Sequence, residues 1–326
     1  MAIEFEEVAD WGEDVWDRDV SGVAVDSRDR VYTLRRGDDA VTVLDRDGTV
    51  LDRWSDDGFS ERPHLISIDD DDKIYIADDG GHRVYVFDLA GHRLETIGSG
   101  IPSETGFDDQ AYPNREIAFD RMPGGPPFNR PTKAVSSPTG ELFVSDGYRN
   151  CRVHRFSADR QLVHSWGGPG AAPGRLVIPH SLTVDNEGRV LVCDRENDRI
   201  QVFSREGELL DVWNDVQRPT DVAVDDRGYV YVTELARGPL DLKSWRLGAA
   251  EQELPGRVTV WSPDRSTAAR ICPPSAGFLA PHAVAVDSTG AIYVSEVPQS
   301  FARSTGRPHR PHRCLHKFEP RAATRS

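Results

Sequence analysis

One short pattern recurs six times along the chain, and it restricts the possible folds more than any other feature. Each copy contains an alternating apolar stretch, a polar turn, and a second apolar stretch that usually ends in an acid. Two copies read Pro179-His-Ser-Leu-Thr-Val-Asp185 with Val190-Leu-Val-Cys-Asp194, and Pro281-His-Ala-Val-Ala-Val-Asp287 with Ile292-Tyr-Val-Ser-Glu296. Alternation of apolar and polar residues predicts half-buried β-strands, and the intervening Asp, Gly and Ser residues predict hairpin turns.

A third and a fourth strand usually follow each pair, as in Arg199–Phe203 and Glu208–Trp213. Four short antiparallel strands that recur about every 40 residues are typical of a β-propeller blade. The 326 residues are therefore predicted to form one all-β domain, a six-bladed β-propeller, rather than two globular domains. The sixth copy lacks a fourth strand, and residues 3–11 resemble one, so the N-terminal strand is expected to close the last blade. The predicted blades cover approximately residues 15–55, 60–98, 128–168, 175–213, 216–272, and 278–320 with 3–11.

The charge of the chain argues against two classes of partner. Its 39 Lys and Arg against 54 Asp and Glu give a net charge of −15. Neither a nucleic-acid backbone nor an anionic membrane is therefore expected as a partner. No apolar run approaches the roughly 18 residues of a membrane span, and no signal peptide is visible. A cytoplasmic location with free thiols is expected, although pairing of Cys272 with Cys314 stays open.

Three long insertions interrupt the repeats, at residues 99–130, 235–256 and 297–312. Because successive strands alternate in direction, all three insertions should lie on the same face of the propeller. Loops that exceed what a scaffold needs are usually functional. This face is therefore predicted to carry the site.

Histidine alternates with a hydroxyl residue at one equivalent position, where the innermost strand of each copy begins. Copies two, four and six carry His64, His180 and His282, and the other three carry Ser or Thr. Alternate blades of six stand about 120° apart, so the three imidazoles should converge on the central axis. Three histidines with one open coordination position are typical of catalytic zinc sites, although iron, manganese or copper would accept the same ligands.

Other polar residues follow the second strands on the same face. Arg36, Tyr148 and Arg195 all stand at such positions. A tyrosine beside a cation and an arginine can serve as a general base, and an arginine can hold a carboxylate through two hydrogen bonds. The expected partner is a small-molecule or peptide-derived substrate that carries a carboxylate.

Motifs of the third and fourth copies resemble those of the peptidyl-α-hydroxyglycine α-amidating lyases, which are six-bladed NHL-repeat propellers. The matching segments are Val144-Ser-Asp-Gly-Tyr148, Ile178-Pro-His-Ser-Leu182 and Cys193-Asp-Arg-Glu-Asn197. The resemblance implies a zinc-dependent lyase. Such an enzyme cleaves the C–N bond of an α-hydroxyglycine-type carbinolamide, and the products are an amide and a glyoxylate-like acid.

The resemblance also implies roles for individual residues. His64, His180 and His282 would bind the zinc, and Arg36 would bind the substrate. Tyr148 would be catalytic, with Arg195 as its partner. Ala283 stands where the family has an Asp that binds a structural calcium, so structural Ca²⁺ should be weakly bound or absent.

Two other functions fit the sequence. A propeller of this kind could use its metal to hydrolyse a lactone or an ester. An NHL propeller can also be a non-catalytic scaffold that binds a protein through one face.

Overall fold

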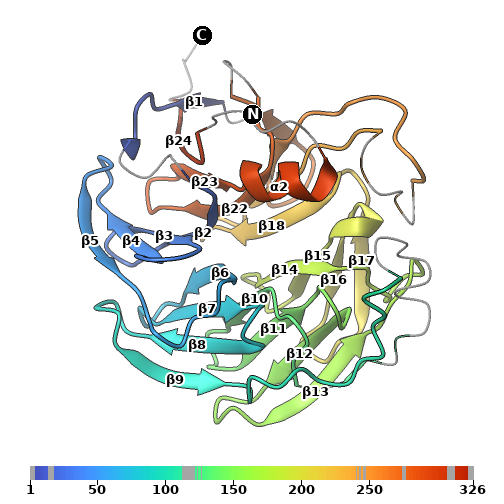
Figure 1. Ribbon diagram of the computed structural model, residues 1–326. Helices are drawn as coiled ribbons and strands as arrows, with labels where there is room; N and C mark the ends of the chain where they lie inside the picture. The colour runs from blue at the N-terminus through green and yellow to red at the C-terminus, as the bar shows by residue number, and fades with distance from the viewer. Residues whose placement is uncertain are drawn as a thin grey trace.

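The computed structural model describes residues 4–13, 18–111, 122, 124–125, 127–239, 241, 244, 247–273, 277–306 and 313–321. Within these residues, six four-stranded antiparallel sheets are arranged around a central axis (Figure 1). The innermost strands of neighbouring sheets contact one another. The innermost strand of the first sheet also contacts that of the last, so the ring of blades is closed. This is the six-bladed β-propeller that the repeats predict.

Each of the first five sheets is a meander whose strands pair in chain order. Blades one to three contain β2 (Val20–Val25), β3 (Val31–Arg35), β4 (Val41–Leu44) and β5 (Val50–Trp54); β6 (Pro63–Ile68), β7 (Ile74–Asp78), β8 (Arg83–Phe87) and β9 (Arg93–Ile97); and β10 (Lys133–Ser136), β11 (Leu142–Asp146), β12 (Arg152–Phe156) and β13 (Leu162–Gly167). Blades four and five contain β14 (Pro179–Val184), β15 (Val190–Asp194), β16 (Arg199–Phe203) and β17 (Leu209–Trp213); and β18 (Pro219–Val224), β19 (Val230–Glu234), β20 (Arg257–Trp261) and β21 (Ala268–Ile271).

The N-terminal strand closes the sixth blade, as predicted. This blade contains β22 (Pro281–Val286), β23 (Ile292–Glu296) and β24 (Leu315–Pro320), and β1 (Phe5–Glu7) pairs antiparallel with β24. The pairing places Glu7 opposite Phe318 and covers the backbone edge of β24, which would otherwise be open.

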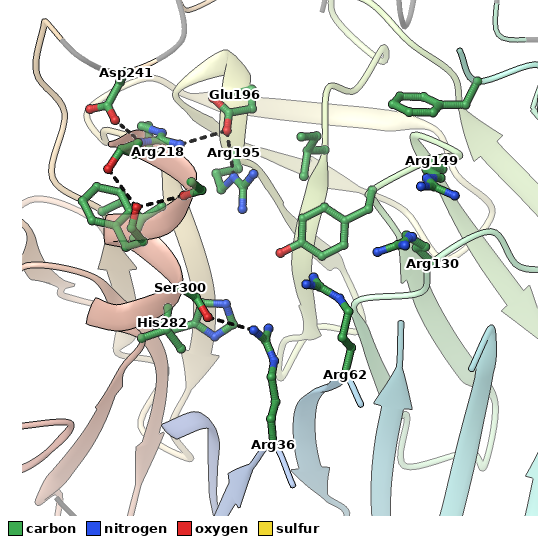
Figure 2. A pocket seen from close by; sticks show the side chains of 18 of the residues that line it. Arg36, Arg62, Arg130, Arg149, Arg195, Glu196, Arg218, Asp241, His282 and Ser300 are labelled. Atoms are coloured by element: carbon green, nitrogen blue, oxygen red, sulfur yellow. Dashed lines mark hydrogen bonds and ion pairs between the residues drawn. The ribbon is translucent and has the colours of Figure 1, made fainter. Parts of the chain in front are cut away.

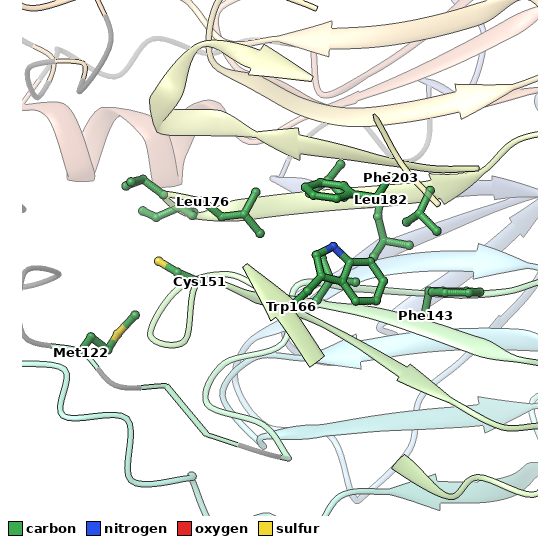
Figure 3. Close-up of a cluster of buried hydrophobic side chains, with 12 residues drawn as sticks. Met122, Phe143, Cys151, Trp166, Leu176, Leu182 and Phe203 are labelled. Atoms are coloured by element: carbon green, nitrogen blue, oxygen red, sulfur yellow. The ribbon is translucent and has the colours of Figure 1, made fainter. Parts of the chain in front are cut away.

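Burial decreases from the inner strands to the rim. Every residue of the second strands β7, β11, β15, β19 and β23 is buried, whereas the outer strands β9 and β17 each have a single buried residue. Apolar side chains of neighbouring blades pack between the sheets. Figure 3 shows the cluster between blades three and four, where Phe143, Trp166, Leu182 and Phe203 lie together. The propeller therefore has several cores between its blades.

A buried carboxylate at the end of a second strand fixes the loop that leads into the same blade. Asp146 Oδ2 accepts a hydrogen bond from the backbone of Asn129 at 2.7 Å, and Asp194 Oδ1 accepts one from Val177 at 2.7 Å. Asp78, Glu234 and Glu296 bind the equivalent loops of their blades in the same way. The acid that ends the repeat therefore positions the loops of one face.

Three further observations complete the fold. The third insertion begins with helix α2 (Pro298–Thr305), which the sequence analysis did not predict. All four cysteines are free thiols, so Cys272 and Cys314 do not pair. No helix among the described residues has the length and apolar character needed to cross a membrane.

Candidate metal centre

Three histidines meet on the propeller axis, where the sequence placed them. His64, His180 and His282 are the second residues of β6, β14 and β22. Their ring centroids lie 4.7, 4.8 and 4.9 Å apart, and their ligand atoms all lie within 4.8 Å of one another. His64 and His180 are fully buried and His282 is 4 % exposed. This group could hold a metal ion.

The Nδ1 atom of each imidazole lies at hydrogen-bond distance from a backbone carbonyl of the next blade. A carbonyl only accepts, so each Nδ1 donates and each neutral ring carries its lone pair on Nε2. Carbonyl partners of this kind fix the tautomer and the orientation of metal-binding histidines. The distances are 2.8 Å from His64 to Thr132, 2.7 Å from His180 to Thr220 and 2.6 Å from His282 to Ser21.

The hydroxyl residues that alternate with the histidines extend these contacts into a ring. Thr132 Oγ1 donates to the Pro179 carbonyl at 3.0 Å, and Thr220 Oγ1 donates to the Pro281 carbonyl at 2.8 Å. Ser21 Oγ makes the equivalent bond to Pro63 at 3.3 Å. Each of these prolines directly precedes a site histidine. The sequence analysis found the alternation but missed this role of the hydroxyls.

The surroundings keep the three imidazoles neutral. Burial lowers the pKa of His64 and of His180 well below the ordinary value, and the positive charges of Arg36 and Arg195 lower these pKa values further. Burial also lowers the pKa of His282, with His64 as the next cause. Neutral imidazole is the form that binds a metal.

Tyr148 contacts two of the histidines. It follows β11, and its Oη lies 2.9 Å from His64 Nε2 and 3.1 Å from His180 Nε2. A phenol has one proton to donate, whereas both Nε2 atoms carry lone pairs, so the hydroxyl satisfies one of them at a time. A cation between the Nε2 atoms would satisfy both. Three neutral imidazoles fit zinc or another divalent transition metal.

A pocket of about 470 Å³ reaches the centre, and His282 and Tyr148 are among the residues that line it. All three long insertions line it, for example through Phe107, Leu235 and Ser300, so they lie on one face as predicted. Figure 2 shows that arginine dominates this pocket. Of the described residues, six arginines line it against three carboxylates, namely Arg36, Arg62, Arg130, Arg149, Arg195 and Arg218 against Asp109, Glu196 and Asp241.

Two of these arginines were candidates from the sequence. Arg195 begins the short 3₁₀ helix η2 (Arg195–Asn197), and its guanidinium carbon lies 5.6 Å from the centre of the Tyr148 ring. Arg36 follows β3, and its Nη1 donates to Ser300 Oγ at 2.9 Å. Burial, and then the charge of Arg62, lower the pKa of Arg36. No carboxylate of the described residues forms an ion pair with Arg36, so it is available to a substrate carboxylate.

The sequence analysis missed Arg62, Arg130 and Arg218. Each directly precedes the proline of its repeat, and Ile178, at the same position of blade four, also lines the pocket. Arg130, Ile178 and Arg218 have φ values of +69°, +56° and +37°, which bulky residues rarely adopt. The position before the proline therefore faces the pocket, and this common register was a signal that the sequence contained.

Comparison with known proteins supports the predicted resemblance. The model of the NHL repeat matches residues 176–203, which include His180 and Arg195. NHL repeat-containing protein 3 of Mus musculus is 29 % identical over 293 residues, covering 84 % of this chain and 76 % of that protein.

Amidating enzymes are also similar. Peptidylglycine alpha-amidating monooxygenase of Rattus norvegicus is 30 % identical over 229 residues, covering 61 % of this chain and 22 % of that protein. A probable peptidyl-alpha-hydroxyglycine alpha-amidating lyase of Caenorhabditis elegans is 28 % identical over 169 residues, covering 50 % of this chain and 43 % of that protein. The chain thus carries an NHL repeat, and its homologues include amidating lyases, as the sequence motifs predict.

Solved structures confirm the fold. A gluconolactonase from Xanthomonas campestris has a TM-score of 0.59 at 14 % identity, covering 94 % of this chain and 88 % of that one. Virginiamycin B lyase from Staphylococcus aureus has a TM-score of 0.55 at 11 % identity, covering 90 % and 82 %. At such identities the likeness shows the propeller fold alone.

Proposed function

We propose that the protein is a zinc-dependent carbon–nitrogen lyase that cleaves an N-acyl-α-hydroxyglycine to an amide and glyoxylate. One observation carries the proposal. Three buried histidines meet, two of them contact the Tyr148 hydroxyl, and His282, Tyr148 and Arg36 line one pocket, where Arg36 pairs with no carboxylate of the described residues. The similarity to amidating lyases supports the same reaction, although the aligned region spans only 43 % of the Caenorhabditis elegans protein.

The site residues divide the chemistry between them. Zinc held by the Nε2 atoms of His64, His180 and His282 would supply the Lewis acid that makes the substrate hydroxyl more acidic. Arg36 holds the substrate carboxylate through charge-assisted hydrogen bonds. Tyr148 Oη takes the proton of the hydroxyl as general base, and the Arg195 guanidinium over its ring stabilises the phenolate charge.

The bond changes balance without water or an oxidant. The electron pair released from the O–H bond forms the carbonyl of glyoxylate while the C–N bond breaks. The amide nitrogen receives the electron pair of the broken bond and takes up a proton. A hydrolase would instead add water across the acyl bond and release a carboxylic acid.

Metal analysis tests the centre before any substrate is needed. Purified protein is expected to contain about one equivalent of zinc, and His180→Ala is expected to lose most of it because one of three ligands is gone. His164→Ala is the matched control, since His164 is exposed on β13 and should leave the metal in place. Wild-type protein that binds no metal would favour the scaffold function instead.

Product analysis tests the reaction. Incubation with an N-acyl-α-hydroxyglycine should release glyoxylate and the primary amide in equal amounts. A folded, metal-loaded protein that releases no glyoxylate from such compounds would overturn the proposed function. Release of the carboxylic acid in place of the amide would indicate hydrolysis.

A further inference from the structure

Three arginines of the pocket gather apart from Arg195. Figure 2 shows Arg130 and Arg149 together on one side of the pocket, with Arg62 between this pair and Arg36. Arg195 lies across the pocket beside Glu196, which its Nε contacts at 3.0 Å. The proposed chemistry uses Arg36 and Arg195 and leaves the other group without a role.

The nearby carboxylates do not balance this group. Asp79 is buried behind it, 2.9 and 3.1 Å from Arg62 nitrogens and 3.4 Å from Arg130 Nη1. Arg149 Nη2 lies 2.6 Å from Asp109, whose side chain is 55 % exposed. Among the described residues, the three guanidinium groups therefore share two carboxylates, and solvent competes for the second of these, Asp109.

The protein retains this crowding of like charges at a cost. Burial, and then the positive charge of Arg130, lower the pKa of Arg149. Arg130 also has a left-handed backbone conformation, and its buried Nε has no hydrogen-bond partner among the described residues. Strained backbone and under-neutralised charge concentrate at sites that bind ligands. A bound anion would relieve the repulsion.

We propose that Arg62, Arg130 and Arg149 form a second anion-binding subsite, which receives a carboxylate on the acyl part of the substrate. The inference rests on the proposed function and narrows its substrate to an N-acyl-α-hydroxyglycine derived from a dicarboxylic acid. With its α-carboxylate at Arg36, the substrate extends its acyl group toward another part of the pocket. Guanidinium groups suit a carboxylate there because they can donate two parallel hydrogen bonds.

The size and the charge of the pocket agree with a small dianion. A volume of about 470 Å³ is that of a small-molecule site. In the part of the pocket that the structure describes, six arginines exceed three carboxylates, in a chain whose net charge is −15. Such a local reversal of sign attracts anions to the pocket.

Binding of unreactive compounds tests the subsite. N-succinylglycine and N-glutarylglycine carry the second carboxylate, whereas N-butanoylglycine and N-pentanoylglycine match their lengths without it, and none has the α-hydroxyl that the reaction needs. By isothermal titration calorimetry, the better of the two diacids should bind about tenfold more tightly than the monoacid of the same length, the gain typical of a charge-assisted hydrogen bond.

Two pocket variants should move this preference in opposite directions. Arg149→Gln should abolish the preference for the diacids over the monoacids. Asp109→Asn frees Arg149 from its carboxylate and should increase the preference. Arg53→Gln, on the exposed outer strand β5, removes the same charge outside the pocket and should preserve it.

Either of two results would overturn the subsite: no preference for a diacid in the wild-type protein, or a preference that persists in Arg149→Gln. If none of the four compounds binds to the wild-type protein, there is no preference for a diacid, and the proposal is overturned. If Arg149→Gln does not fold, Asp109→Asn gives the decisive measurement. Because the compounds do not react, these results are separate from the glyoxylate assay, which tests the lyase function itself.

Discussion

At Thr220, one residue supports two histidines of the centre. Its carbonyl accepts from His180 Nδ1 at 2.7 Å, and its hydroxyl donates to the carbonyl of Pro281, the residue before His282, at 2.8 Å. Valine has the same shape and the same backbone carbonyl, so Thr220→Val keeps the bond to His180 and removes only the contacts of the hydroxyl, which also lies 2.9 Å from Thr233 Oγ1. The variant separates positioning of the histidines from their chemistry.

Thr220→Val should therefore weaken metal binding while it leaves all three ligands in place. We expect zinc affinity to fall by about tenfold, which is the smaller of the losses usual when a hydrogen-bond partner of a metal ligand is removed. The unsatisfied Pro281 carbonyl should cost about 1–3 kcal/mol of unfolding free energy. Competition with a zinc chelator and urea denaturation measure the two effects. Thr96→Val, exposed on β9, is the control, and lower stability with unchanged zinc affinity would reduce Thr220 to a structural role.

Tyr148→Phe tests the proposed base without disturbing the metal ligands. Loss of a general base usually slows a reaction by about 10²- to 10⁴-fold, and kcat for glyoxylate release should fall by this amount. Zinc content should remain that of the wild type, because the Nε2 atoms and their carbonyl-bound Nδ1 atoms are retained. A Phe variant that keeps full turnover would remove Tyr148 from the chemistry.

The sequence allowed only part of this site to be predicted. His64, His180 and His282 occupy one register position of regular strands, so the repeat alone placed them on the axis. Arg130 and Arg218 reach the pocket through left-handed backbone conformations before a proline, where an extended conformation is the usual one. The repeat showed their common register but not the direction of their side chains.

At the level of elements, β1 is only three residues long. Both its pairing with β24 and contacts of its side chains hold it in place. Glu7 Oε1 lies 2.9 Å from His316 Nδ1, and Glu296 Oε1 lies 3.0 Å from His316 Nε2. Burial alone would lower the pKa of His316, but the bonds to Glu296 and Glu7 outweigh it and raise this pKa. The bond to His316 in turn lowers the pKa of Glu7.

The closure of the sixth blade should consequently depend on pH. A raised histidine pKa stabilises the fold below its ordinary value of 6.5, and this contribution disappears as pH rises through the folded-state pKa. The lowered pKa of Glu7 stabilises the fold above the ordinary value of 4.5. This stabilisation is lost as pH falls through the folded-state pKa of Glu7. The contact is therefore strongest between these two ordinary values.

Glu7→Gln should reduce the unfolding free energy by about 1 kcal/mol at pH 5.5, because Glu7 is partly exposed, and by much less at pH 9. Urea denaturation at the two pH values measures the difference. Glu6→Gln, on the same strand but exposed, should show no such dependence. Arg313 Nη1, 3.6 Å from Glu7 Oε1, stays charged at both pH values, so an equal loss would contradict a contact between Glu7 and charged His316.

The elements differ in how far the sequence determined them. Alternation and turn residues predicted the blades and the closing strand, since each repeat buries the same faces. Helix α2 was missed because it belongs to an insertion outside the repeat. Its signals were nevertheless present, with Pro298 at the first turn and Gly306 at the C-cap with a φ of +72°.

At the scale of the whole molecule, one buried ion pair links four blades across the axis. Lys133 Nζ of β10 lies 2.5 Å from Asp221 Oδ1 of β18. The same carboxylate accepts from Ser181 Oγ of β14 at 2.5 Å and from the backbone of Val284 in β22 at 3.1 Å. Lys133, Ser181 and Asp221 each follow the residue that belongs to the histidine ring. This layer of the axis therefore supports the ring above it.

Removal of the lysine should destabilise the entire propeller, because an uncompensated carboxylate would remain buried among four blades. Lys133→Met is expected to lower the unfolding free energy by about 3–5 kcal/mol. Asp221→Asn in the same chain removes the stranded charge and keeps an acceptor for Ser181, so the double variant should recover part of the loss. Urea denaturation of both single variants and the double variant gives the coupling energy. Lys73→Met, whose partner Asp71 is exposed, is the control and should change stability by less than about 0.5 kcal/mol. If the two single losses simply add in the double variant, the ion pair does not hold the blades together.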